Sequence, residues 1–457
     1  MQDNLPTTLI IFGATGDLMA KKIVPSLWHL FTHGTLPSGW RVVGISRRDL
    51  DDGKFRELVK EFLAKYGPSE RNTADEARFF EMFSFARVAF ESDTDFKSLA
   101  ALLDEREKTA GPFNRLIYMA VPPDAFPSIF SHAGFGTIVK HGEEHGCHTH
   151  IIIEKPFGTD LTSAHALEAV LAKRFTEEQL YRADHYLAKP MLRNIPHFRF
   201  GSEHPLLEHL WNREHISKIH IRTLEPLGVE SRGAFYDPLG TLRDVGQNHL
   251  LEILALLTME PPASRDAMHA REARAAAIRA LQPFADDDIT SRTYRAQYDS
   301  YRHIDGVRPE SDTETYYALT AYLNTPRWQG VPIVMEAGKR MAGWQTEAIV
   351  SFKDGGMAVF RMRPEEELVV TMNGEEKRIE LPRAETTQQY VAEYARILMD
   401  AAKGDQTLFI DPKEIEACWT FIDPIEAGWE KGLTPLASYA PDTNDAANAA
   451  EKKLSVQ

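Results

Sequence analysis

A tight glycine turn follows the first apolar run of the chain, and it restricts the fold more than any other feature. Residues 8–12 read Thr-Leu-Ile-Ile-Phe, and Gly13-Ala-Thr-Gly16-Asp17-Leu18 follows at once, before an apolar pattern with helical spacing. Such a turn between a strand and a helix lets backbone N–H groups approach a pyrophosphate, whose charge the helix dipole favours. A plain strand-to-helix connection is the alternative at this point.

The first third of the chain alternates short apolar runs with helical patterns. We predict strands at residues 8–12, 41–45, 87–90, 115–120 and 150–153, with an amphipathic helix over 55–66. This alternation is typical of βαβ units around a parallel sheet. We therefore expect an α/β Rossmann domain over residues 1–175. A glycine turn at this place in such a domain favours nucleotide binding over a plain connection.

After residue 215 the pattern changes to strands with few helices between the later ones. We predict strands at 217–224, 313–324, 346–352, 357–362 and 367–372, and helices at 248–258 and 388–402. This indicates a larger α+β domain with a predominantly antiparallel sheet over residues 176–435. Residues 283–309 are polar with little periodicity, so long connections are expected there. Residues 436–457 contain few large apolar side chains and are expected to form a disordered tail.

Charge and cysteine content exclude several classes of partner. The chain has 52 lysines and arginines against 67 aspartates and glutamates, a formal net charge of −15. A surface for nucleic acid or anionic membrane is therefore not expected, because such binding needs cationic residues. No apolar run approaches the ~20 residues that cross a bilayer. Two cysteines, Cys147 and Cys418, favour a reducing compartment, so we expect a cytoplasmic protein.

The second predicted strand is followed by basic residues. Ser46, Arg47 and Arg48 stand where an acid that reads the ribose would be expected in a site for NAD. An arginine suits a 2′-phosphate, because its guanidinium can make paired bonds to phosphate oxygens. NADP is thus favoured over NAD, and solvated loop charges are the alternative.

The first of three stretches with reactive side chains is Glu154-Lys155-Pro156-Phe157-Gly158, directly after the fifth predicted strand. Chain leaving the carboxyl end of such a strand faces the ligand crevice of the sheet. A cis bond before Pro156 would fix a bend that aims Lys155 inward. A simple turn with an exposed lysine is the alternative.

The second stretch, Asp184-His185-Tyr186-Leu-Ala-Lys189, gathers a carboxylate, an imidazole, a phenol and an ammonium. His185, Tyr186 and Lys189 supply the donors that a phosphate monoester needs. The alternative is a polar surface turn.

The third stretch, Arg243-Asp244-Val-Gly-Gln247-Asn248-His249, leads into an apolar helix. Histidine is the side chain best matched to proton transfer near neutral pH. A hydrogen-bonded histidine of the core is the alternative for His249.

In these motifs, and in their order over residues 7–430, the chain resembles the glucose-6-phosphate dehydrogenase family. The resemblance rests on Gly13-Ala-Thr-Gly-Asp-Leu with Lys22, Glu154-Lys-Pro-Phe-Gly, Asp184-His-Tyr-Leu-x-Lys189, Leu210-Trp-Asn-Arg213, Glu225-Pro-x-Gly228, Arg243-Asp-x-x-Gln-Asn-His-Leu250, Thr313-Glu-Thr, Trp328-x-Gly-Val-Pro, Gly338-Lys339 and Gly404-Asp-Gln-Thr-Leu-Phe409. It implies oxidation of the C1 hydroxyl of β-D-glucose 6-phosphate to the 6-phosphoglucono-lactone, with NADP accepting the hydride. It also implies a homodimer or homotetramer whose interface is the antiparallel sheet.

The resemblance also implies roles for individual residues. His249 would be the general base, and Asp184 the carboxylate that orients its imidazole. His185, Tyr186 and Lys189 would hold the 6-phosphate. Other substrate contacts would come from Lys155, Glu225, Asp244 and Lys339. The residues implied at the cofactor are Gly13, Thr15, Gly16, Asp17, Leu18, Lys22, Ser46, Arg47 and Lys155. No metal is expected, because the nicotinamide provides the electron sink.

Several positions depart from the family pattern. Trp344 stands where the family has a second basic residue, and Glu336 where an arginine is usual. Ala188 and Ala296 replace glycines, while Arg340 is a candidate to replace the missing cation. Loss of one cation near an anion costs on the order of 1 kcal/mol, or about tenfold in affinity.

These departures leave other functions open. A related dehydrogenase of another hexose phosphate, or of an unphosphorylated hexose, would keep His249 and Asp184. A noncatalytic NADP-binding sensor would be expected to lose that pair. A metal site at His141, His145, Cys147, His148 and His150 is a further alternative, but their irregular spacing favours a solvated connection.

Overall fold

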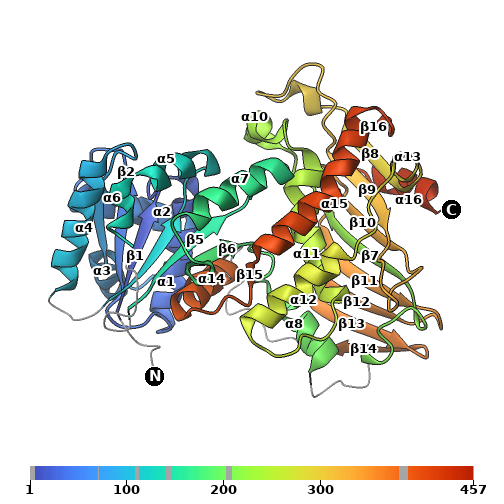
Figure 1. Cartoon of the computed structure of the whole chain (residues 1–457), viewed down its shortest axis with the longest axis horizontal. Helices are drawn as coiled ribbons and strands as arrows, with labels where there is room; N and C mark the ends of the chain where they lie inside the picture. The colour runs from blue at the N-terminus through green and yellow to red at the C-terminus, as the bar shows by residue number, and fades with distance from the viewer. Residues whose placement is uncertain are drawn as a thin grey trace. The chain divides into compact units, whose positions relative to one another are not determined.

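The computed structural model describes residues 6–69, 71–108, 113–139, 147–201, 208–379 and 390–455, which form two compact units (Figure 1). The first unit comprises Met1–Gly158, Thr162–Ala188 and Ala384–Ile410. The second comprises Thr159–Leu161, Lys189–Arg383 and Asp411–Gln457. The first unit thus includes residues 176–188 and a late segment, both of which the predicted boundary at residue 175 assigns to the second domain.

The first unit is built on a seven-stranded sheet, in the order β15-β6-β5-β4-β1-β2-β3. Every pair of neighbours is parallel except β15 and β6, which confirms the predicted α/β fold. The strands are β1 (Thr7–Phe12), β2 (Arg41–Ser46), β3 (Phe83–Arg87), β4 (Asn114–Met119), β5 (Thr149–Glu154), β6 (Leu180–Ala183) and β15 (Phe409–Ile410).

Helices cover this sheet in the described residues of the first unit. The π-helix η1 (Met19–Ile23) continues as α1 (Val24–Thr32), and a late helix, α14 (Val391–Lys403), joins the same hydrophobic core. The remaining helices are α2 (Asp52–Tyr66), α3 (Thr73–Glu81), α4 (Asp93–Glu107), η2 (Pro123–Ala125), α5 (Phe126–Ser131), α6 (Ala133–Gly136), α7 (Leu161–Ala172) and η4 (Glu177–Gln179).

The third strand differs from its predicted position at residues 87–90. β3 instead covers Phe83–Arg87, where Phe83 and Phe85 alternate with more exposed side chains. Their rings pack against Phe55 of α2, at centroid distances of 6.3 and 5.2 Å. Val88 and Phe90 of the predicted strand are also buried, but they lie beyond the end of β3, so this apolar run placed the predicted strand too late in the chain.

The second unit contains a nine-stranded, mostly antiparallel sheet, as predicted. Its strand order is β14-β13-β12-β11-β7-β10-β9-β8-β16, and its parallel pairs are β7 with β10 and β8 with β16. The strands are β7 (Ile216–Leu224), β8 (Thr293–Tyr298), β9 (Tyr316–Ala321), β10 (Ile333–Gly338), β11 (Gln345–Phe352), β12 (Met357–Arg363), β13 (Glu367–Met372), β14 (Glu375–Ile379) and β16 (Leu436–Tyr439).

A continuous helical segment of the second unit carries the third reactive stretch. The π-helix η6 (Leu242–Leu250) runs directly into the buried α11 (Leu251–Thr258). The other helices are α8 (Pro190–Phe200), η5 (Glu230–Arg232), α10 (Gly233–Tyr236), α12 (Ala267–Arg279), α13 (Asp286–Arg292), η7 (Tyr301–His303), α15 (Pro412–Glu430) and α16 (Asp445–Leu454). Among the described residues, no helix is both long and apolar enough to span a bilayer.

Two predictions for the second unit are wrong. The expected disordered tail forms β16, which pairs with β8, and α16, whose Ala446 and Ala450 are buried. Small alanines pack closely here, so low hydrophobic content did not mean disorder. The expected long connections at 283–309 contain α13 and β8, where Arg295 is buried because its guanidinium donates to the carbonyls of Thr434 and Trp429.

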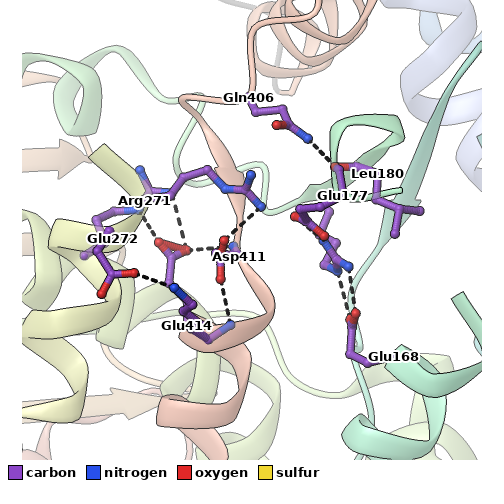
Figure 2. A network of polar contacts seen from close by, with 11 residues as sticks. Glu168, Glu177, Leu180, Arg271, Glu272, Gln406, Asp411 and Glu414 are labelled. Carbon is purple, nitrogen blue, oxygen red and sulfur yellow. Dashed lines mark hydrogen bonds and ion pairs between the residues drawn. The ribbon is translucent and has the colours of Figure 1, made fainter. Parts of the chain in front are cut away.

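Buried ion pairs join α12 to the start of α15 within the second unit (Figure 2). Arg274 Nε lies 2.9 Å from Glu414 Oε1, and Arg271 Nη2 lies 3.5 Å from Asp411 Oδ2. Asp411 and Glu414 also form the capping box of α15, so the same two carboxylates fix the start of α15 and its contact with α12.

A separate network holds the edge of the sheet in the first unit (Figure 2). Arg182 of β6 donates to both Glu168 and Glu177, with distances of 2.7 to 3.0 Å. The Gln406 amide donates to the carbonyls of Glu177 and Leu180, beside the short strand β15. These contacts fix the strand that leads into the second reactive stretch.

Candidate active site

The glycine turn lies between β1 and η1 and fits a nucleotide. Gly13 has φ +83°, and a Cβ there would lie 2.2 Å from the carbonyl oxygen of Ala120. Only glycine therefore fits this position, where the Gly13 N–H donates to the Ile45 carbonyl at 3.0 Å. Gly16 and Asp17 are exposed, and Thr15 and Leu18 are half-buried. The turn lies at the carboxyl edge of the parallel sheet, where such folds bind ligands.

The basic residues after β2 lie at the same edge of the sheet. Ser46 is buried, and its hydroxyl oxygen accepts the Arg48 N–H at 3.2 Å. Arg47 is exposed, with its guanidinium 5.7 Å from the centre of the Phe90 ring. An exposed arginine beside the adjoining βα turn is suited to a ribose 2′-phosphate.

Lys22 lies in η1 and contacts aromatic rings of a late helix. Its Nζ lies 3.6 Å from the ring centre of Tyr390 and 5.0 Å from that of Tyr394. These are cation–π distances. The chain thus holds an ammonium one turn beyond the glycine turn, where a negatively charged ligand would bind.

The Lys155-Pro156 stretch follows β5, which ends at Glu154, and the Lys155–Pro156 peptide bond is cis, in agreement with the hypothesis of a fixed bend. The Glu154 carboxylate accepts hydrogen bonds from the hydroxyls of Tyr118 and Tyr394, the latter at 3.0 Å. Burial raises the pKa of Glu154, and both hydroxyls and the charges of Lys22 and Lys155 oppose that rise. A half-buried carboxylate therefore lies close to two cations predicted to bind the ligands.

The second reactive stretch follows β6. Asp184 is buried, and its Oδ1 accepts the Tyr186 N–H at 2.9 Å and lies 3.9 Å from His185 Nδ1. The His185 ring lies 5.5 Å from Tyr390 and 6.3 Å from Tyr394, between centroids. His185 thus shares its aromatic neighbours with Lys22.

In the second unit, Glu225, Asp244 and Lys339 meet. β7 and β10 are parallel neighbours in register, so Glu225 and Lys339 follow directly at adjacent strand ends. Lys339 Nζ lies 3.2 Å from Glu225 Oε2 and 3.6 Å from Asp244 Oδ2. Burial lowers the pKa of Lys339, but the two carboxylates outweigh it, so the pKa lies above its ordinary value. Three groups able to bind sugar hydroxyls therefore converge.

His249 is buried in η6, five residues after Asp244. The π-helical geometry is visible at the end of this segment, because the backbone N–H of Leu251 donates to the carbonyl of Gly246, five residues back. π-helical turns occur frequently at functional sites. A buried imidazole in such a segment, beside the carboxylate and lysine pair, is suited to proton transfer.

Some predicted partners belong to different units. Asp184, His185 and Tyr186 lie in the first unit, whereas Lys189 and His249 lie in the second. Lys189 is the N-cap residue of α8. The pairing of Asp184 with His249, and the joint phosphate site of His185, Tyr186 and Lys189, therefore stay predictions.

The departures from the family pattern have local explanations. Glu336 is buried in β10, where its carboxylate accepts a hydrogen bond from the hydroxyl of Tyr316 and lies 2.9 Å from His220 Nε2. The Trp344 ring lies 4.5 Å from the guanidinium of Arg363.

Arg340, the candidate replacement cation, forms a two-point ion pair with Asp442, at 2.9 and 2.7 Å. Its charge is therefore engaged by the C-terminal segment that was expected to be disordered. Ala188 and Ala296 are buried small residues.

The histidines near β5 contact backbone carbonyls of the region around α14. His141 and His145 lie outside the described residues. His148 Nε2 lies 3.3 Å from the Ala402 oxygen, and His150 Nδ1 lies 2.6 Å from the Ala401 oxygen. Burial lowers the pKa of His150 to about 3, so it is neutral.

Four residues around these groups were not predicted from the sequence: Tyr118, Tyr390, Tyr394 and Glu314. Tyr390 and Tyr394 lie more than 350 positions after Lys22, and no local spacing relates them to it. The Thr313-Glu-Thr motif did contain Glu314, but without a role. Its Oε1 accepts the N–H of Leu242, the first residue of η6, at 2.8 Å.

Comparison with known proteins relates both units to one family. The family model described as "Glucose-6-phosphate dehydrogenase, NAD binding domain" matches residues 10–194, and that for the C-terminal domain matches residues 197–455. The glucose-6-phosphate 1-dehydrogenase of Treponema pallidum is 35% identical, over 95% of this chain and 91% of its own length. That of Emericella nidulans is 34% identical, over 92% and 85% respectively.

A solved structure gives the same relationship. A glucose-6-phosphate dehydrogenase "in complex with its substrate glucose-6-phosphate" superposes with a TM-score of 0.87 and 30% identity, over 99% of this chain and 98% of that chain. The corresponding enzyme of Mycobacterium avium gives a TM-score of 0.84 and 28% identity.

Proposed function

This chain belongs to the glucose-6-phosphate dehydrogenase family, and we propose that it oxidises the C1 hydroxyl of β-D-glucose 6-phosphate to 6-phospho-D-glucono-1,5-lactone. NADP is the proposed hydride acceptor. The family resemblance puts this reaction at the entry of the oxidative pentose phosphate pathway. The observation that carries the proposal is the convergence of Lys339 and Glu225 on Asp244, which belongs to the same π-helical segment as His249.

The first unit supplies the proposed cofactor site. The backbone of the glycine turn would approach the pyrophosphate, because a Cβ has no room at Gly13. The residues of this turn are Gly13, Thr15, Gly16, Asp17 and Leu18. Ser46 and the exposed Arg47 would read the ribose 2′-phosphate, which favours NADP over NAD. Lys22 and Lys155 would lie towards the nicotinamide and the substrate.

The second unit carries the proposed general base. His249 would remove the proton of the C1 hydroxyl while the hydride leaves C1. Loss of that proton allows the C1 oxygen to form the carbonyl bond of the product. Asp184 would hold the imidazole in one tautomer and stabilise its protonated form. His185, Tyr186 and Lys189 would bind the 6-phosphate, and Glu225, Asp244, Lys155 and Lys339 the remaining substrate groups. When bound, the nicotinamide supplies the electron sink.

A second candidate is dehydrogenation of another hexose phosphate or of an unphosphorylated hexose. It is favoured by Trp344, which replaces a basic residue, and by the engagement of Arg340 with Asp442. Both features reduce the positive charge that the family pattern would place near a phosphate.

The deciding experiment is a matrix of kcat/KM values for glucose 6-phosphate, glucose and other hexose phosphates, each with NADP and with NAD. We expect the highest value for glucose 6-phosphate with NADP. A higher value for free glucose would overturn the phosphate assignment to His185, Tyr186 and Lys189. Binding of NADP without reduction by any of these sugars would indicate the noncatalytic sensor.

We also infer a homodimer or homotetramer in a reducing, cytoplasmic environment. The assembly is supported by the family resemblance, which assigns the interface to the antiparallel sheet, and light scattering after gel filtration tests it. The environment is supported by Cys147 and Cys418, which are buried thiols.

A further inference from the structure

We propose that Tyr390 is a positioning residue for Lys22, and that its ring orients the lysine ammonium towards the NADP site. The inference rests on the proposed function in one respect, because Lys22 is assigned to cofactor and substrate there. Tyr390 itself would touch neither ligand, and would act through the ammonium that it contacts.

The contact has the geometry of a close cation–π pair. Lys22 Nζ lies 3.6 Å from the centre of the Tyr390 ring, whereas the Tyr394 ring is at 5.0 Å. The attraction comes from the negative face of the ring and is stronger where water is partly excluded. Lys22 is half-buried, in contrast to its neighbour Lys21, which is exposed and pairs with Asp17 at 2.7 Å. Two adjacent lysines are thus held by different chemistry.

The backbone fixes the ring over the lysine. Tyr390 precedes α14 with φ +68°, a left-handed conformation that non-glycine residues adopt only when their surroundings impose it. The next residue, Val391, accepts a hydrogen bond from the Ser26 hydroxyl at 3.0 Å. Ser26 belongs to α1, which continues the π-helix that carries Lys22 (Figure 1). The start of α14 is therefore anchored to the same helical segment as the lysine.

Tyr394 extends the arrangement to other site residues. Its hydroxyl donates to Glu154 at 3.0 Å, and its ring faces both Lys22 and His185. The Tyr390 ring also approaches His185, at 5.5 Å between centroids. Two aromatic rings thus lie between a residue assigned to the cofactor and one assigned to the substrate phosphate. Because the Tyr390 ring is the nearer of the two, its removal should affect the position of the Lys22 ammonium more than removal of the Tyr394 ring.

The test compares Tyr390→Leu, which removes the ring, with Tyr390→Phe, which keeps it. NADP affinity is measured by calorimetric titration without sugar, so the readout does not depend on catalysis. We expect Tyr390→Leu to weaken NADP binding about 3- to 30-fold, and Tyr390→Phe to stay within about twofold. Equal losses in the two variants, or no loss in Tyr390→Leu, would overturn the proposal.

Lysine labelling gives a second readout that a general packing defect would not produce. The ligand-free protein is treated briefly with acetic anhydride, and acetylation of Lys22 relative to Lys21 is measured by peptide mass spectrometry. In Tyr390→Leu we expect this ratio to rise severalfold, and in Tyr390→Phe to stay unchanged. An unchanged ratio in Tyr390→Leu would contradict the contact, even if thermal melting showed a loss of stability.

A double-mutant cycle isolates the pair. If Tyr390 acts through Lys22, Tyr390→Leu should have little further effect on NADP affinity in a Lys22→Met background. A full additional loss there would show that the ring acts on something else. Failure of the wild-type protein to oxidise glucose 6-phosphate would sink the proposed function, but this binding and labelling pattern would still decide the present inference.

Discussion

The two helices that bear the principal candidate residues both start as π-helices, but their surroundings differ in kind. In the first unit, η1 carries Lys22, and its ammonium contacts neutral tyrosine rings at the start of α14. In the second unit, η6 carries His249, and its first N–H is bound by the buried carboxylate of Glu314. One segment is thus held by aromatic packing and the other by buried charge.

The charged surroundings of η6 include more than one acid. Burial raises the pKa of Glu314 to about 7 and that of Glu426 well above its ordinary value. Arg243 of η6 lies 3.4 Å from Glu426 and 3.9 Å from Glu430. Tyrosine side chains stay neutral across physiological pH, whereas Glu314 titrates there. We therefore expect Glu314 to make the stability of η6 depend on pH, whereas the contact of the tyrosine rings with Lys22 involves no carboxyl group.

The largest expected effect is on η6 itself. His249→Asn should lower kcat by about 10²- to 10⁴-fold, because it removes the proposed general base. Steady-state NADPH formation at saturating substrate measures this. His303→Asn, at an exposed histidine of the same unit, is the matched control and should leave kcat unchanged. Retention of most activity in His249→Asn would remove the chemical role assigned to η6.

A smaller effect should follow from Lys339→Met. This change leaves Glu225 and Asp244 without the ammonium that they both approach, so the KM for glucose 6-phosphate should rise about 10- to 100-fold. The adjacent Arg340→Met is the control, and its KM should change less than about twofold because Arg340 is bound to Asp442. Similar KM changes in both variants would mean that Lys339 has no special place in the site.

The pH response should separate the two helices further. The folded protein keeps a proton on Glu314 up to about pH 7, whereas the unfolded chain releases it near 4.5. The folded state therefore binds more protons within this window, and this group makes the free energy of unfolding fall as pH rises. Glu314→Gln should remove that fall, for a relative gain on the order of 1 to 3 kcal/mol at pH 8 over pH 5.

Urea unfolding of wild type and Glu314→Gln at several pH values measures this difference. The exposed Glu310→Gln serves as the control and should follow the wild-type curve. If the wild-type and Glu314→Gln curves were parallel from pH 5 to 8, Glu314 would not be a titrating group beneath η6.

The smallest effect is expected at the exposed ion pair of η1. Lys21→Ala removes a solvent-exposed contact to Asp17, so the free energy of unfolding should change by less than about 0.5 kcal/mol. Urea unfolding at neutral pH measures it. A loss above about 1 kcal/mol would show that charge, as well as aromatic packing, stabilises η1.

The fold could be predicted from the sequence where periodicity or a local motif determines the structure. The parallel sheet, the glycine turn and the helix after Asp244 follow from patterns within a few residues. The strand β8 and the C-terminal β16 and α16 did not, because their polar or small side chains are satisfied by distant partners such as Thr434 for Arg295.

The residues of the candidate site could likewise be predicted only where a local motif contains them. Motif residues such as Lys22 and Lys339 were identified, but the residues that hold them were not. Tyr390 contacts Lys22 only because α14 returns to the first unit after strands β7 to β14 of the second sheet. Glu314 reaches η6 from a segment more than 60 residues later in the chain. Such long-range contacts leave no spacing signal in a single sequence.

The most direct test of the account is to follow deuterium from C1. Glucose 6-phosphate labelled with deuterium at C1 is incubated with NADP and the wild-type protein, and the reduced nucleotide is analysed by mass spectrometry. We expect one deuterium in each NADPH formed, with 6-phospho-D-glucono-1,5-lactone as the sugar product. Unlabelled NADPH, or no NADPH from this substrate, would contradict it.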